Sequence, residues 1–137
     1  MQLGEYLAYA QAFGARAYDD VLTYWAPAFR CEIGGINMFS NGAELKAFYG
    51  FLHDHITEEI LVDRYLADDA NVFMEARVRI SGLKSLSADR IRESGFSGLY
   101  PIEAGQRFDL PQLIHYHRHE GKFTKAICLM NGAPIVL

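Results

Sequence analysis

The chain has 137 residues, half of them apolar, and a formal net charge of -4. A chain of this length can bury one good core and is too short for two, so a single domain over residues 1–137 is expected. The thirteen Lys and Arg residues form no basic block, which argues against nucleic acid as a partner. No stretch approaches the roughly 20 apolar residues of a membrane span and no basic leader precedes an apolar run, so we expect a soluble, cytoplasmic protein without a membrane partner.

The N-terminal part of the chain has the pattern of two helices and a short strand. Apolar residues recur at three- and four-residue intervals from Leu3 to Ala17, which predicts an amphipathic helix. A second, short helix is predicted over residues 20–26, where Pro27 helps to end it. Residues 29–33 are then expected to form a strand.

A third helix is the clearest in the chain. Asn41 and Glu44 have the spacing of a capping box, and an apolar stripe at helical intervals follows them up to Leu52. The irregular segment 81–105 is longer than an ordinary connection. It is therefore expected either to carry a short helix over residues 88–94, between Ser87 and Gly95, or to act as a lid.

After the third helix the apolar period changes from 3.6 to 2. Alternation over residues 71–80 predicts a strand with one core face, and residues 58–68 and 109–131 are expected to complete an antiparallel sheet. Glu120 and Gly121 mark the turn of the last hairpin. Helices followed by strands indicate an α+β fold, in which three N-terminal helices pack on a strongly curved, mostly antiparallel sheet and form a cone with an internal pocket.

Three segments resemble a known group of proteins. YDDVLTYWAPAFRCEIGG (18–35) is similar to the second helix, short strand and glycine turn of the nuclear transport factor 2-like superfamily, which includes ketosteroid isomerases and SnoaL-like polyketide cyclases. NGAELKAFYGFL (41–52) resembles its third helix, and HRHEGKFTKAICLMNG (117–132) resembles its terminal hairpin. The resemblance implies the cone fold. It does not choose an activity, because this fold hosts isomerases, dehydratases, cyclases, epoxide hydrolases and proteins without chemistry.

The resemblance to the isomerases also implies catalytic positions. Tyr9 falls where those enzymes place a hydrogen-bonding tyrosine, and Glu32 falls near their proton-shuttling carboxylate. The position of their second acid is taken by Ile114 or His115. Asn131 stands in the region where SnoaL-like cyclases carry an acidic residue.

Chemistry leaves two interpretations for each of the two main candidates. Glu32 could be a general base whose carboxylate is partly desolvated by an apolar pocket, or it could simply pair with Arg30 on the same strand face. Tyr9 could hold an enolate oxygen, or it could be a core tyrosine bonded to the backbone.

The row His115, His117 and His119 shares one strand face, and a His-x-His pair on a strand can ligate a metal. No third or fourth ligand is evident, and the resemblance brings no metal, so no metal site is expected. A two-residue turn would place His115 opposite Ala126, and a three-residue turn would place Ile114 there. We favour the histidines on the outer face, and His115 is counted with Glu32 and Tyr9 as a candidate catalytic residue.

The first functional hypothesis is a cofactor-independent enzyme of the isomerase, dehydratase or cyclase kind, which acts by proton transfer on an apolar, cyclic small molecule. The second is a non-catalytic ligand-binding or dimeric scaffold domain. A homodimer is expected because Phe73, Arg77 and Arg79 share one exposed strand face. Cys31 and Cys128 match no zinc or redox spacing and are interpreted as apolar fillers. The expected substrate-binding residues are Phe13, Trp25, Phe48, Tyr116, Ala126, Cys128 and Met130.

Overall fold

The computed structural model describes residues 1–137 as four helices and seven strands. The helices are α1 (Leu3–Gly14), α2 (Tyr18–Leu22), α3 (Gly42–Leu52) and α4 (Ala88–Ser94). The strands are β1 (Trp25–Ile33), β2 (Ile36–Asn41), β3 (Ile56–Ala67), β4 (Asn71–Gly82), β5 (Arg107–His119), β6 (Lys122–Met130) and β7 (Ile135–Val136). None of the helices is long and apolar enough to cross a membrane.

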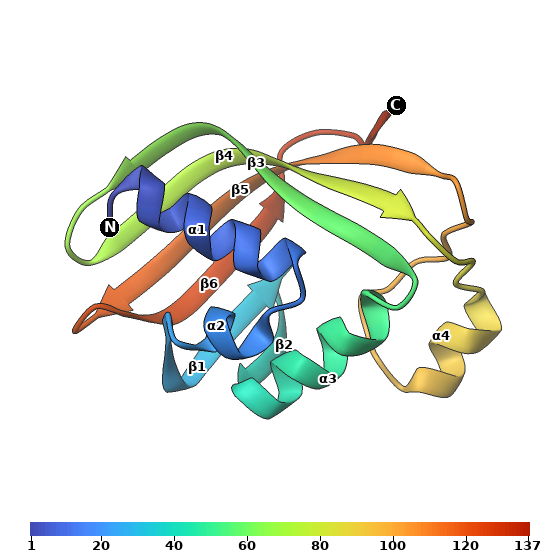
Figure 1. The fold of residues 1–137 in the computed structure, drawn as a ribbon, viewed down its shortest axis with the longest axis horizontal. Helices are drawn as coiled ribbons and strands as arrows, with labels where there is room; N and C mark the ends of the chain where they lie inside the picture. The colour runs from blue at the N-terminus through green and yellow to red at the C-terminus, as the bar shows by residue number, and fades with distance from the viewer.

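All seven strands belong to one sheet, which the first three helices cover on one face (Figure 1). Its order is β2-β1-β6-β5-β4-β3, and β7 pairs with the start of β5. The neighbours are antiparallel except for β1 and β6, which run parallel. The long strands β3, β4 and β5 curve around the helices, while α4 lies beyond the far ends of β4 and β5 (Figure 1). The predicted α+β architecture is confirmed.

Helix α1 buries Tyr6, Ala10 and Phe13 of its predicted apolar stripe, together with Tyr9, but it leaves the two leucines of the stripe exposed. Tyr6, Tyr9 and Phe13 are at most 7% exposed, whereas Leu3 and Leu7 are 42% and 45% exposed. The expected stripe therefore combined residues from two faces of the helix. The buried face carries two phenols toward the concave side of the sheet.

The predicted end of the second helix, at residue 26, is wrong by several residues. Helix α2 ends at Leu22, and β1 already begins at Trp25, so Pro27 lies within the strand instead of ending a helix. Proline cannot donate to the strand ladder. Accordingly, the pairing of β1 with β6 is irregular between Trp25 and Arg30.

The other two helices begin with side-chain caps. The cap predicted at Asn41 is present, although the Glu44 carboxylate accepts from the Ser40 amide and not from that of Asn41. The side chain of Asn41 accepts a hydrogen bond from the Glu44 amide at 3.0 Å at the start of α3. Helix α4 occupies the predicted residues 88–94. Its cap is Ser87, whose hydroxyl accepts from the Arg90 amide at 3.1 Å, and Gly95 ends it with a φ of 75°.

The β5–β6 hairpin has a register that neither predicted turn produces. Glu120 and Gly121 form a two-residue turn with positive φ angles, but a bulge at Thr124 then shifts the pairing and places Tyr116 opposite Ala126. Opposite residues of an antiparallel pair share a face. Tyr116 and Ile114 are consequently buried, and the favoured orientation, with the histidines outside, is confirmed.

Candidate active-site cavity

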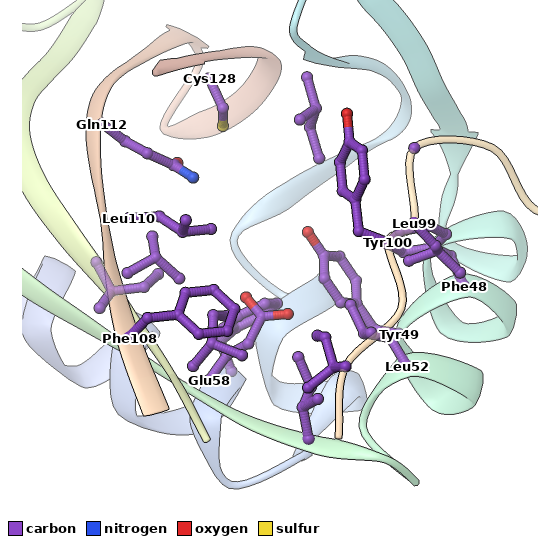
Figure 2. A pocket seen from close by; sticks show the side chains of 18 of the residues that line it. Phe48, Tyr49, Leu52, Glu58, Leu99, Tyr100, Phe108, Leu110, Gln112 and Cys128 are labelled. Atoms are coloured by element: carbon purple, nitrogen blue, oxygen red, sulfur yellow. The ribbon is translucent and has the colours of Figure 1, made fainter. Parts of the chain in front are cut away.

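A cavity of about 760 Å³ lies between the helices and the concave face of the sheet. This volume is typical of small-molecule sites. Of the 34 residues that line it, 26 are hydrophobic, and helices α1 and α3, the six long strands and the segment 98–102 all contribute (Figure 2). All seven residues expected to bind substrate lie in its wall, namely Phe13, Trp25, Phe48, Tyr116, Ala126, Cys128 and Met130.

Glu58 is the only acidic side chain in this wall. Along β3, Ile56, Glu58 and Ile60 share the inward face because side chains alternate on a strand. The carboxylate points into the cavity among apolar side chains (Figure 2), and the side chain is 10% exposed. A carboxylate in such surroundings is the arrangement that a general base for carbon acids requires.

His53 stands behind Glu58, at the residue that follows the last turn of α3. Its side chain is 2% exposed, and Nε2 lies 3.3 Å from Glu58 Oε1. On the other side of the ring, Nδ1 lies 2.7 Å from the hydroxyl of Tyr18. The carboxylate is therefore held by a buried imidazole rather than by water alone.

Tyr49 supplies a phenol to the same cavity. It lies one helical turn before His53 on α3, and its hydroxyl points into the space (Figure 2). No protein group hydrogen-bonds this hydroxyl. Burial, followed by the nearby Glu58 carboxylate, raises the pKa of Tyr49 well above its usual value. The phenol consequently keeps its proton at neutral pH and is free to donate it to a bound ligand.

Tyr9 lines the cavity as expected, but its hydroxyl belongs to an aromatic cluster. Trp25 Nε1 donates to the Tyr9 hydroxyl at 3.2 Å, and the hydroxyls of Tyr6 and Tyr116 lie 3.0 Å apart beside it. Burial raises the pKa of Tyr9, so this phenol also stays protonated. A catalytic role for Tyr9 remains a prediction.

The expectation that Glu32 lines the cavity is wrong. Its carboxylate is bound by Arg30 at 3.1 Å and by Lys125 at 3.4 Å, and hydrogen bonding to Arg30 is the main cause that lowers its pKa. Cys31 and Ile33 line the cavity, so the residue between them faces away. The simple ion-pair interpretation of Glu32 is the correct one.

His115 also lies outside the cavity, on the outer face of the sheet. Its Nε2 is 2.8 Å from the side-chain oxygen of Asn71, and its ring lies 4.7 Å from that of His117, centroid to centroid. The structure holds no group of three or more His, Cys, Asp or Glu side chains placed to bind a metal ion. The expectation that His115 is a catalytic residue is therefore wrong, because this residue does not reach the cavity.

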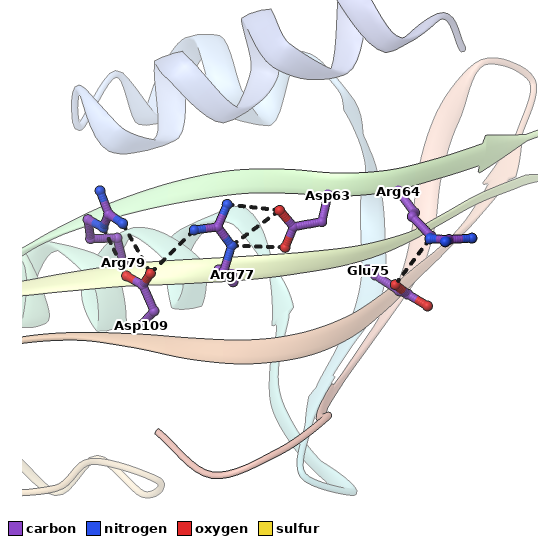
Figure 3. Close-up of polar contacts among 6 residues, drawn as sticks. All are labelled: Asp63, Arg64, Glu75, Arg77, Arg79 and Asp109. Carbon is purple, nitrogen blue, oxygen red and sulfur yellow. Dashed lines mark hydrogen bonds and ion pairs between the residues drawn. The ribbon is translucent and has the colours of Figure 1, made fainter. Parts of the chain in front are cut away.

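The same outer face carries a ladder of ion pairs (Figure 3). Arg79 binds Asp109 through two hydrogen bonds of 2.9 and 3.1 Å, and Arg77 binds Asp63 at 2.8 Å while also lying 3.5 Å from Asp109. The arginines expected to mark a dimer surface thus have carboxylate partners within the chain.

The two cysteines are poor nucleophiles. Both line the cavity, and burial raises the pKa of Cys128 to about 12 and that of Cys31 further still. Since the thiolate is the reactive form, neither thiol is activated at neutral pH. Their interpretation as apolar fillers agrees with this environment.

Sequence reasoning missed the residues that make the polar part of the cavity. Glu58 was included in a predicted strand without a role, and Tyr49 was counted only as part of an apolar stripe. A signal was present, because Glu58 occurs in phase with Ile56, Ile60 and Val62, so an inward-facing row contains one carboxylate.

No protein-family model matches the sequence, and no curated protein matches it. Solved structures do share its fold. A proposed polyketide cyclase from Xanthomonas campestris is 20% identical with a TM-score of 0.73, covering 93% of this chain and 88% of its own. An LEH-like epoxide hydrolase from M. tuberculosis is 14% identical with a TM-score of 0.66, covering 90% and 77%. An NTF2-like protein of unknown function from Burkholderia pseudomallei is 14% identical with a TM-score of 0.65, covering 90% and 85%. The chain therefore has the cone fold of the nuclear transport factor 2-like superfamily, as the resemblance of its sequence implied.

Proposed function

We propose that this protein is a cofactor-independent enzyme of the isomerase, dehydratase or cyclase kind, which transfers a proton on an apolar, cyclic small molecule with Glu58 as the general base. The observation that carries the proposal is the single carboxylate in an apolar cavity wall, backed by a buried imidazole. The names of the structural neighbours, polyketide cyclase and epoxide hydrolase, are compatible with small-molecule chemistry on this fold.

The proposed reaction removes a proton from a carbon beside an electron-withdrawing group. Glu58 accepts the proton, and the electron pair left behind moves toward the ligand's electronegative atom. Tyr49 donates a hydrogen bond to that atom, where negative charge develops. The apolar residues around both groups exclude water, which strengthens the electrostatic interactions of each.

The activity can be tested with 5-nitrobenzisoxazole, a flat, apolar carbon acid. A base removes its C3 proton, the C–H electron pair forms the nitrile, and the N–O bond breaks to leave a coloured phenolate. Glu58→Gln keeps the shape of the side chain and loses the base, so the rate should fall by about 10²- to 10⁴-fold. Glu59→Gln is the matched control, because its side chain is exposed on the opposite face of β3 and should leave the rate unchanged.

The non-catalytic binding domain is the second candidate, and it is favoured by the absence of a second acidic side chain from the cavity. A wild-type rate no higher than that of an equal concentration of acetate would reject catalysis by Glu58. Equal rates for wild type and Glu58→Gln would do the same. In either case, stabilisation by 5-nitrobenzisoxazole that is equal in wild type and Glu58→Gln would favour binding alone.

A further inference from the structure

We infer that Tyr18 and His53 are positioning residues for Glu58: Tyr18 fixes the tautomer of His53, and the Nε2–H of His53 holds the Glu58 carboxylate toward the cavity. This inference rests on the proposed function of Glu58. It assigns a role in the proposed reaction to two residues that do not themselves line the cavity.

The imidazole of His53 is fixed by aromatic rings on several sides. Its centroid lies 5.2 Å from those of Phe13 and Tyr49, and the Tyr18 ring is stacked on it at 5.9 Å with an interplanar angle of 14°. The backbone is held as well, since Arg16 donates a hydrogen bond to the His53 carbonyl oxygen at 3.2 Å. The ring therefore has little freedom to turn away from Glu58.

The hydroxyl of Tyr18 lies within reach of two acceptors beside His53. The Tyr18 hydroxyl lies 3.0 Å from the Tyr49 carbonyl oxygen and 2.7 Å from His53 Nδ1, and it has one hydrogen to donate. The Tyr49 carbonyl already accepts the backbone N–H of His53 at 2.8 Å. If the hydroxyl donates to this carbonyl, Nδ1 must carry the imidazole proton. If it donates to Nδ1, the shorter of its two contacts, no group is left unpaired and the proton of a neutral imidazole lies on Nε2.

The opposite tautomer conflicts with the geometry at Glu58. It would place the lone pair of Nε2 against the carboxylate oxygen 3.3 Å away, with no hydrogen between them. With the proton on Nε2, this contact becomes a hydrogen bond to Glu58 Oε1. The second carboxylate oxygen is then left to take the proton from the ligand.

The tautomer can be measured directly by ¹⁵N NMR of the histidine side chains. The wild type should show His53 with a protonated Nε2 and an Nδ1 that accepts a hydrogen bond. In Tyr18→Phe, the Nδ1 resonance should move downfield toward the position of an unbonded ring nitrogen. A wild-type spectrum with the proton on Nδ1, or no change in Tyr18→Phe, would overturn the inference.

Kinetics with 5-nitrobenzisoxazole test the same arrangement. His53→Leu removes the donor and should lower kcat by about 10- to 100-fold, with a much smaller change in KM, because the base is misplaced rather than lost. His53→Gln should recover part of this loss, since its side-chain amide can donate to Glu58. His55→Gln is the matched control, because His55 is also buried but bonds the Phe51 carbonyl oxygen outside the cavity.

The two levels of proposal fail in different ways. If Glu58→Gln keeps the wild-type rate, the proposed function is wrong. If Glu58→Gln is inactive but His53→Leu, His53→Gln and Tyr18→Phe all keep the wild-type kcat, only the positioning inference is wrong. Should His53→Leu fail to fold, Tyr18→Phe and His53→Gln still decide the question through the NMR spectrum and kcat.

Discussion

Gly14, the last residue of α1, lies close to the backbone of β3. A Cβ at this position would lie 2.9 Å from the backbone carbonyl oxygen of Glu58, and ordinary contact begins at 3.4 Å. The gap must therefore open by about 0.5 Å in Gly14→Ala. Backbone gives way less readily than a flexible side chain, and Glu58 is paired with Ile80 in the β3–β4 ladder.

The control for this variant is Gly50→Ala, in the interior of α3, where a Cβ meets nothing within 4 Å. Gly50→Ala should stabilise the protein by about 0.5–1 kcal/mol through helix propensity alone. Gly14→Ala also gains propensity, but it adds an overpacking penalty of about 1–3 kcal/mol. Its free energy of unfolding should be lower than that of Gly50→Ala by roughly this amount.

Urea unfolding measures the difference, because a change of midpoint at constant slope is a change of stability. The same displacement moves Glu58, so Gly14→Ala should also turn over 5-nitrobenzisoxazole more slowly than Gly50→Ala. Equal midpoints for the two variants would refute the close approach of α1 to β3.

Three further predictions concern other parts of the molecule. Hydrogen bonding to Arg79 lowers the pKa of Asp109 below its ordinary value of 3.8. The ionised Asp109 therefore stabilises the fold fully above pH 3.8, and this stabilisation is lost as the pH falls through the lower, folded-state pKa. The stability difference between wild type and Asp109→Asn should shrink below pH 3.8, and a constant difference would contradict this. Because the pKa of Cys128 is raised to about 12, iodoacetamide at pH 8 should modify this thiol much more slowly in the native than in the unfolded protein, and equal rates would count against the raised pKa. We also propose a homodimer through the outer sheet face around Phe73, which is 38% exposed; a monomer in sedimentation at micromolar concentration would reject it.

Signals confined to a few residues predicted structure well. Helix α4 was bounded correctly by Ser87 and Gly95, because a capping hydroxyl and a left-handed glycine act within one turn. The start of α3 was predicted by Asn41 for the same reason. These elements depend on chemistry between neighbours in the sequence, which a single chain displays directly.

Register was harder to predict, because it depends on irregularities that the strand pattern does not display. The β1–β6 pairing is irregular around Pro27, and β1–β2 slips again between Cys31 and Glu32. A one-residue slip moves a side chain to the opposite face. Such a slip explains why the resemblance placed Glu32 in the cavity, although its neighbours Cys31 and Ile33 are the residues that line the cavity.

The proposed catalytic groups are, by contrast, close together in the sequence. Tyr49 and His53 are four residues apart and therefore lie on one side of the end of α3. A short turn at residues 53–55 then leads into β3, whose inward-facing row begins with Ile56 and continues with Glu58. The segment YGFLHDHITE (49–58) thus brings a phenol, an imidazole and a carboxylate together without help from distant strand register. A polar residue in phase with an apolar row is costly to bury unless it is paired, and His53 supplies the partner. Glu58 both faces the apolar cavity and is paired with a buried imidazole, and for this reason we place the chemistry there. Glu32 has neither property, because its partners Arg30 and Lys125 lie on the outside of the sheet.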